Sequence, residues 1–308
     1  NTAVGSNALF SNTTASSNAA VGKNALYANT TGTDNVAVGY GALDANTTTS
    51  YNTAVGKNAL GATVAEGNTG VGREALSTNS TGADNTAVGK GALQSNTTAA
   101  NNVAVGKNAL FQNTTGDKNV AVGTLALDAN TTGVYNTAMG YEALSANTTT
   151  HENTAIGYNS LKVNVAASNT ALGSSSLYSN TTGTLNTALG YQALYTNVDG
   201  DNSTAVGYQA LYTQEPASNV DMHNTAVGFN SMYALTTGIK NNAVGSYSLD
   251  AAVTGDFNNA FGYQALTANT SGASNSAFGH NALVANTTAS HNVAVGRDAM
   301  LSNTTGSN

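Results

Sequence analysis

The chain lacks cysteine and tryptophan, holds a single proline and is poor in charge. Without cysteine it has no disulfide framework and no thiolate metal site. Its 308 residues include 9 Lys and Arg against 16 Asp and Glu, too few charges for an ordinary globular surface. Charge-driven disorder is also disfavoured, because 40% of the residues are apolar and the net charge is only −7. The acidic balance with dispersed cations is not typical of a nucleic-acid-binding protein.

Long apolar runs are missing as well. No run approaches the ~18 residues of a membrane span, and the N-terminus has no charged region followed by an apolar one. We therefore expect neither membrane insertion nor a signal peptide in this segment.

The sequence consists instead of one repeat, NTAVGxxALxxNTTGxx. Its constant glycine is spaced by 17 residues, with two steps of 16 and one of 21. These glycines are Gly5, Gly22, Gly39, Gly56, Gly72, Gly89, Gly106, Gly123, Gly140, Gly157, Gly173, Gly190, Gly207, Gly228, Gly245, Gly262, Gly279 and Gly296. The sequence thus predicts a single continuous solenoid of 17-residue repeats over residues 1–308, with an irregular coil at 208–224.

Each repeat contains two short apolar segments separated by turn-forming residues. The first is TAVG, as in Thr53–Gly56, and the second is centred on Ala59 and Leu60; both are predicted to be strands. NTTG segments such as Asn29–Gly32 are predicted to form turns. The predicted fold is all-β: a parallel β-solenoid, or β-roll, of eighteen coils. Strands stacked at ~4.8 Å would give a rod of roughly 86 Å.

The apolar positions predict how the coils are filled. Neighbouring strand residues point to opposite faces, so we expect the Val4-type and Leu9-type columns to fill the interior and the alanines beside them to lie outside. A face of small residues allows another backbone to approach closely, which favours a parallel homotrimer; a single solenoid with a flat surface is the alternative. The asparagine that opens nearly every repeat is expected to form a hydrogen-bonded ladder from coil to coil.

The repeat phrases resemble known sequences. NTAVG and NVAVG are similar to strand motifs in the head regions of trimeric autotransporter adhesins, which form left-handed parallel β-rolls in trimers. The longer phrase at Asn186–Gly190, followed by Tyr191, Ala193 and Leu194, is more similar to repeat regions of phage-type tail-fibre proteins. The resemblance covers the whole chain, although the repeat is longer than is usual in adhesin heads. It implies a β-roll fold and a role in an extracellular fibre.

Groups that could carry chemistry are scattered. His151, His223, His280 and His291 lie in different registers of the repeat, without carboxylates at metal-ligand spacing. A repeat array also multiplies the same Asn, Thr and Gly and does not bring an acid, a base and a nucleophile together. We therefore expect no enzyme, no metal and no cofactor.

Two outer positions of the repeat hold organised side chains. They are candidate contacts for a ligand or glycan, the alternative being solvated charges and aromatic ladders that stabilise the coils. The position after the constant glycine provides Lys57, Arg73, Lys90 and Lys107 and, in later coils, Tyr191, Tyr208 and Phe229. The position after the Ala-Leu pair provides Tyr178, Tyr195, Tyr212 and Tyr233.

Asn-x-Ser/Thr triplets recur, mostly at one repeat position. They are candidate N-glycosylation sites in a glycosylating pathway, the alternative being that NTT is only a turn motif. The asparagines are Asn12, Asn29, Asn46, Asn79, Asn96, Asn113, Asn130, Asn147, Asn180, Asn202, Asn269, Asn286 and Asn303.

Taken with the resemblance, these patterns predict a structural and adhesive fibre segment of a surface adhesin or a tail-fibre-like shaft. Its expected location is extracellular, at a cell or virion surface, and its expected partners are its own copies and surface glycans or a host receptor, with no nucleic acid. The alternative is a self-assembling extracellular filament subunit whose Asn-x-Ser/Thr triplets could carry N-linked sugars. Such a subunit would stack end to end, because both ends of a solenoid expose unpaired strand backbone. The insertion Gln214–His223 is expected to protrude beside Tyr208, Tyr212 and Phe229 as a contact loop or register device.

Overall fold

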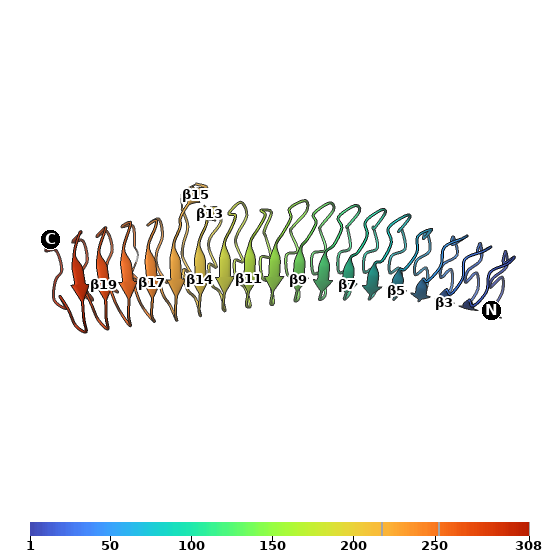
Figure 1. Ribbon diagram of the computed structural model, residues 1–308, viewed down its shortest axis with the longest axis horizontal. Helices are drawn as coiled ribbons and strands as arrows, with labels where there is room; N and C mark the ends of the chain where they lie inside the picture. Colours follow the sequence, from blue (N-terminus) through green and yellow to red (C-terminus); the bar gives the residue numbers. More distant parts are fainter. Residues whose placement is uncertain (217, 252, 308) are drawn as a thin grey trace. The chain divides into compact units, whose positions relative to one another are not determined.

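The computed structural model describes residues 1–216, 218–251 and 253–307, and over these residues the chain is a parallel β-solenoid without helices. The predicted all-β fold is confirmed. The chain divides into two compact units, Asn1–Asn153 and Thr154–Asn308, called here the N-terminal and the C-terminal unit. Within each unit, one short strand per coil pairs in parallel with the equivalent strand of the next coil (Figure 1).

The strands of the N-terminal unit are three residues long and occupy the TAV part of each repeat. They are β1 (Thr2–Val4), β2 (Ala19–Val21), β3 (Val36–Val38), β4 (Thr53–Val55), β5 (Thr69–Val71), β6 (Thr86–Val88), β7 (Val103–Val105), β8 (Val120–Val122) and β9 (Thr137–Met139).

The C-terminal unit repeats this arrangement and adds a small second sheet. Its main strands are β10 (Thr154–Ile156), β11 (Thr170–Leu172), β12 (Thr187–Leu189), β14 (Thr204–Val206), β16 (Thr225–Val227), β17 (Asn242–Val244), β18 (Asn259–Phe261), β19 (Ser276–Phe278) and β20 (Val293–Val295). The second sheet is a parallel pair, β13 (Gly200–Asp201) with β15 (Val220–Asp221).

The constant glycine follows each strand of the main sheet because no other residue fits there. Gly56 has φ +134°, a backbone conformation that L residues with a side chain rarely adopt. A Cβ on Gly56 would also lie 2.6 Å from the carbonyl oxygen of Gly72 in the next coil. The chain therefore turns sharply after every strand, and successive glycines pack backbone against backbone.

The second predicted strand is wrong. The Ala-Leu segment is a turn in which Asn58 has φ 54° and Leu60 has φ 52°. The coils still bond to one another there, since the Leu43 amide donates to the Ala59 carbonyl at 3.1 Å. Left-handed backbone on both sides of Ala59 breaks the alternation of a strand, so Ala59 and Leu60 both point inward and are fully buried.

The interior is also arranged differently from the prediction. In β4 the central Ala54 is buried at 0% exposure, whereas Val55 is 36% exposed. The Val4-type column therefore lies on the outside, and the alanines line the core. Space explains the choice: a Cβ placed on Gly70, which takes the alanine position in β5, would lie 3.1 Å from Leu60 Cγ. The leucine of the turn thus packs directly on the strand and leaves room for nothing larger than alanine.

The predicted asparagine ladder is confirmed, and a second one lies inside the coils. The Asn35 amide N–H donates to Asn18 Oδ1 at 2.9 Å, while Asn18 Nδ2 donates to the Gly32 carbonyl at 2.8 Å and closes its own coil. In the second ladder, Asn46 Nδ2 donates to Asn29 Oδ1 at 2.9 Å. Both ladders are buried, and satisfying each amide avoids a penalty of about 1–3 kcal/mol for an unpaired buried polar group.

Candidate binding surfaces

An exposed apolar column runs along the strands of each unit and is called here the outer strand face. It arises because the third residue of each strand points away from the alanine-lined core. Its most exposed members are Val4, Val21, Val38, Val55, Val88 and Met139 in the N-terminal unit and Leu172, Leu189, Val244, Phe261, Phe278 and Val295 in the C-terminal unit. The sequence analysis placed this column inside the coil. The signal that it missed is the alanine at the centre of each strand, between two larger residues, because a position that holds only alanine indicates an interior with little space.

The cations after the constant glycine form a second column. Lys57, Arg73, Lys90 and Lys107 are all exposed, and parallel in-register pairing of β4 through β7 places them on successive coils. Lys23 belongs to the same column and was overlooked because Tyr40 separates it from the others. These five cations are called here the basic column.

Tyr40 lies between two of the lysines of the basic column. The ring centroid is 6.0 Å from Lys23 Nζ and 5.9 Å from Lys57 Nζ, with one lysine from the coil before and one from the coil after. Cation–π attraction of this kind is worth about 0.5–1 kcal/mol at an exposed site. The tyrosine thus separates and stabilises like charges at that point of the column.

In the C-terminal unit the same repeat position is Tyr or Phe in most coils, the exceptions being Ser174, Ser246, His280 and Arg297. Tyr191, Tyr208 and Phe229 stack with ring centroids 5.2 Å and 5.1 Å apart, and all three rings are exposed. Tyr263 and His280 continue the position with another stacked pair at 5.2 Å. The aromatic side chains at this position therefore stack on one another from coil to coil, and their role as ligand contacts stays a prediction.

A second tyrosine ladder follows the Ala-Leu turn. Tyr178, Tyr195, Tyr212 and Tyr233 stack with centroid distances of 5.3, 5.2 and 5.1 Å. Burial raises the pKa of Tyr212, and the neighbouring Tyr195 and Tyr233 raise it further. Because the faces of the middle rings cover one another, these rings present edges and hydroxyls to solvent. The ladder therefore suits hydrogen bonding better than sugar stacking on a ring face.

Most of the candidate glycosylation asparagines belong to the second buried ladder. Fully buried are Asn29, Asn46, Asn79, Asn96, Asn113, Asn130, Asn147, Asn180, Asn269 and Asn286. Their amide groups are occupied by hydrogen bonds inside the coil, as when Asn96 Nδ2 donates to Asn79 Oδ1 at 2.7 Å. Only Asn12, Asn202 and Asn303 are partly exposed. The folded coil thus gives this column a structural role and leaves glycosylation as a prediction for the three accessible asparagines.

The insertion lies on the side of the coils away from the main strands (Figure 1). Asn219 Nδ2 donates to the Thr182 carbonyl at 3.4 Å, and the Met222 amide donates to the Asp201 carbonyl at 3.1 Å. Gln214 and Met222 are buried, whereas Asn219 is exposed. Over its described residues, which omit Ala217, the insertion is tied to the turn edge of neighbouring coils, and none of its hydrogen bonds joins it to the aromatic columns.

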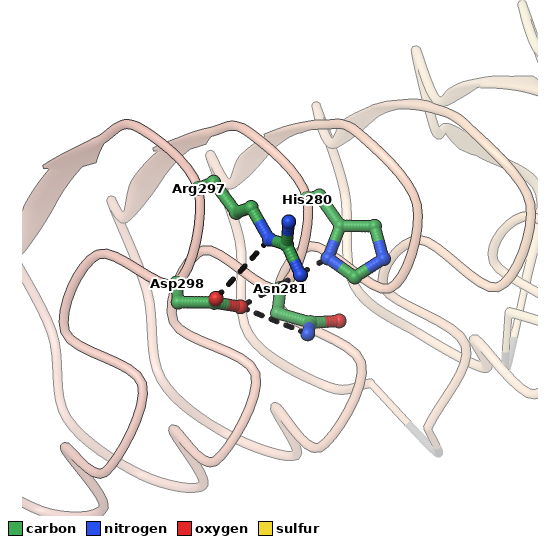
Figure 2. A network of polar contacts seen from close by, with 4 residues as sticks. All are labelled: His280, Asn281, Arg297 and Asp298. Atoms are coloured by element: carbon green, nitrogen blue, oxygen red, sulfur yellow. Dashed lines mark hydrogen bonds and ion pairs between the residues drawn. The ribbon is translucent and has the colours of Figure 1, made fainter.

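One polar cluster stands out in the C-terminal unit (Figure 2). Asp298 accepts a hydrogen bond from Asn281 Nδ2 at 3.0 Å and lies 3.3 Å from Arg297 Nε and 3.9 Å from His280 Nδ1. All four residues come from the two positions after the constant glycine in adjacent coils. The other three histidines, His151, His223 and His291, are exposed, and His151 Nδ1 accepts a hydrogen bond from the Val134 amide at 3.1 Å.

The described parts of the chain also hold no group of three or more His, Asp or Glu side chains close enough to bind a metal ion. In the same residues no helix is long and apolar enough to cross a membrane. No protein-family model matches the chain, and no curated protein matches it either. The resemblance to adhesin heads and tail-fibre repeats therefore rests on the repeat phrases and on the coil architecture.

Proposed function

We propose that the chain is a structural and adhesive segment of an extracellular fibre, without catalytic activity, whose copies associate side by side as a parallel homotrimer. The observation that carries this proposal is the outer strand face. The interior of each coil is already filled by alanine and leucine, so the exposed valines, leucines and phenylalanines are not needed for the coil itself. Continuous exposed apolar surface of this kind is typical of protein interfaces.

Shape and regularity support lateral assembly. In each unit the strands are in register from coil to coil, so the outer strand face is a straight column rather than an isolated patch. A second copy running in the same direction can match it coil by coil, and a closed symmetric group would cover all copies of the face. The choice of three copies, the adhesive role and the extracellular location follow the resemblance to adhesin heads and tail-fibre repeats.

The experiment compares two pairs of lysine substitutions. Val38→Lys with Val88→Lys places charge on the outer strand face, whereas Thr31→Lys with Thr81→Lys places the same charge on exposed turn positions. We expect the wild-type chain and the turn variant to scatter light as trimers at micromolar concentration. The face variant should be a folded monomer, because burying an unpaired ammonium in an apolar interface is strongly unfavourable.

Two results would count against the proposal or redirect it. A wild-type chain that is folded and monomeric at micromolar concentration contradicts lateral assembly. Assemblies that lengthen steadily with concentration, and that the face variant still forms, would favour the filament alternative with end-to-end stacking.

A further inference from the structure

We propose that the basic column of the N-terminal unit is a binding site for a linear anionic polysaccharide that carries one acidic group per sugar. The inference rests on the proposed adhesive function and names the class of ligand. It is carried by the placement and exposure of five cations, of which Lys90 and Lys107 have no ion-pair partner within the described residues.

The spacing of the cations is set by the solenoid. Equivalent residues of β4, β5, β6 and β7 are paired directly, Thr53 with Thr69 and Thr86 with Val103, for example. Side chains after the constant glycine therefore repeat at about 4.8 Å, and Lys57 to Lys107 covers about 14 Å. One coil step is close to the length of one hexose in an extended polysaccharide. The axial spacing of the acidic groups along such a chain therefore matches the axial spacing of the cations.

The charges of the basic column are largely unmatched. The column contains five of the nine cations of a chain whose net charge is −7. Arg73 has an acid at 3.6 Å, on Glu74. Within residues 1–216, 218–251 and 253–307, Lys90 and Lys107 have no ion-pair partner at all. Like charges on neighbouring coils repel one another, so a bound anion would relieve this repulsion.

The residues beside the column favour a polymer that is rich in hydroxyl groups. The residues next to the cations in the coil sequence are Asn24, Asn58, Glu74, Gly91 and Asn108, of which only Glu74 is charged. Amide groups such as those of Asn58 and Asn108 can bond to sugar hydroxyls. An apolar partner gains little there, because the cations would lose hydration without compensation.

Nucleic acid fits the column less well. Duplex DNA carries one charge per ~1.7 Å of helix axis, far denser than one cation per ~4.8 Å of column. Single strands bind by stacking bases on free aromatic faces. The one aromatic ring at the repeat position of the column between Lys23 and Lys107 is Tyr40, which already has lysine ammonium groups from the coils on either side. The overall negative charge adds repulsion against a dense polyanion.

The test uses the full chain, with polygalacturonate as the probe and neutral dextran and an oligothymidylate as comparison polymers. Two quadruple variants have the same net charge, so they separate the column from a general charge effect. The column variant carries Lys57→Gln, Arg73→Gln, Lys90→Gln and Lys107→Gln. The control variant carries Lys118→Gln, Lys162→Gln, Lys240→Gln and Arg297→Gln.

We expect the wild-type chain to bind polygalacturonate in a salt-sensitive manner and not to bind dextran. The column variant should lose affinity by about tenfold or more and show a weaker dependence on salt, whereas the control variant should lose less than about threefold. Circular dichroism should show both variants folded, since the substituted cations of the column are exposed.

Equal losses in the two variants, or no binding of polygalacturonate at low salt, would overturn the inference. Tighter binding of oligothymidylate than of polygalacturonate would overturn it in favour of a nucleic-acid site. The oligomeric state of the same samples is measured by light scattering. A trimer that does not bind polygalacturonate defeats the ligand assignment alone, while a monomer that binds it defeats the assembly proposal and leaves the site standing.

Discussion

The N-terminal and C-terminal units share an interior and differ at the surface. Ala37 and Leu43 in one and Ala188 and Leu194 in the other occupy the same inward positions and are buried alike. The position after the constant glycine is cationic in five of the nine coils of the N-terminal unit, whereas it is Tyr or Phe in five of the nine coils of the C-terminal unit. Inward positions are limited by space, whereas this outer position meets only solvent and its neighbours in the column. The fold is therefore specified by the constant residues, and any recognition depends on the variable ones.

The units also differ inside, at the second asparagine ladder. In the N-terminal unit it is interrupted only by Thr63, which is itself buried and polar. In the C-terminal unit Gln214 replaces the asparagine in the irregular coil, and the next coil has the buried Leu235 at this position. A polar ladder is thus dispensable for a coil, provided that no amide is left without a partner.

The largest effect on stability is expected when a charge replaces the buried Leu110, in comparison with the same charge at an exposed strand position of that coil. Leu110→Asp should destabilise the chain by about 4 kcal/mol or more, because it removes a buried leucine and buries an unpaired charge. Asp tolerates the left-handed backbone of this position, φ 51°, so the loss does not come from the main chain. Urea unfolding followed by circular dichroism measures the change, and hydrogen exchange shows which coils open.

Val103→Asp in the same coil is the matched control. Val103 lies at an exposed strand position, and its replacement should cost less than about 1 kcal/mol. Equal losses from the two substitutions would contradict the assignment of inside and outside, and so would a folded Leu110→Asp variant of wild-type stability.

An intermediate effect is expected from converting the irregular coil into a regular one. Ser203 and Gln214 compensate for each other: Gln214 Nε2 donates to Ser203 Oγ and to Asn197 Oδ1, each at 3.0 Å, while Gln214 Oε1 accepts from Asn224 Nδ2 at 3.0 Å. The longer amide therefore fills the place left by the shorter serine. Gln214→Asn alone should cost about 1–2 kcal/mol through lost buried hydrogen bonds.

The double variant Ser203→Asn with Gln214→Asn restores the pair found in regular coils and should cost less than Gln214→Asn alone. A double-mutant cycle from urea unfolding should give a coupling of about 1 kcal/mol or more. Asn85→Ser with Asn96→Gln makes the reverse exchange in the N-terminal unit and should be better tolerated than either change by itself. Additive effects in both cycles would show that the two residues do not compensate for each other.

The sequence predicted the period, the parallel coils and the first asparagine ladder, because each depends on a residue that repeats with almost no variation. It did not predict which way the strand faces. Alternation shows that Ala54 and Val55 point in opposite directions, and apolar character favoured valine as the buried one. The deciding fact is the left-handed turn at Leu60, which drives that side chain onto the strand and leaves space only for alanine. Propensity gives no sign of this, since leucine rarely adopts positive φ.

The candidate surfaces were predictable to the extent that they are columns. The basic and aromatic columns follow directly from a fixed period, so Lys90 and Tyr208 lie where the repeat places them. Two features needed coordinates: the two lysines beside the Tyr40 ring, and the burial of asparagines such as Asn113. A triplet shows that an asparagine could accept a sugar, but whether its amide is free depends on hydrogen bonds between coils.

The smallest effect concerns two carboxylates that follow the Ala-Leu turn, Asp128 in the N-terminal unit and Asp250 in the C-terminal unit. Burial raises the pKa of Asp128 in the N-terminal unit from 3.8 to about 6, and the negative charge of Glu142 adds to the rise. Folding therefore favours the protonated form: the stabilisation is present below about pH 4 and is lost as pH rises through about 6. Asp128→Asn removes this pH dependence. The variant should be more stable than the wild type at pH 7, and the difference should disappear near pH 4.

In the C-terminal unit, burial likewise raises the pKa of Asp250, but Thr267 Oγ1 donates a hydrogen bond to its carboxylate at 2.5 Å and opposes the shift. Asp250→Asn should accordingly gain less at pH 7. Urea unfolding of the three proteins at pH 4 and pH 7 measures both differences, and an Asp128→Asn variant less stable than the wild type at pH 7 would show that the charged carboxylate is stabilised by the coil rather than penalised by burial.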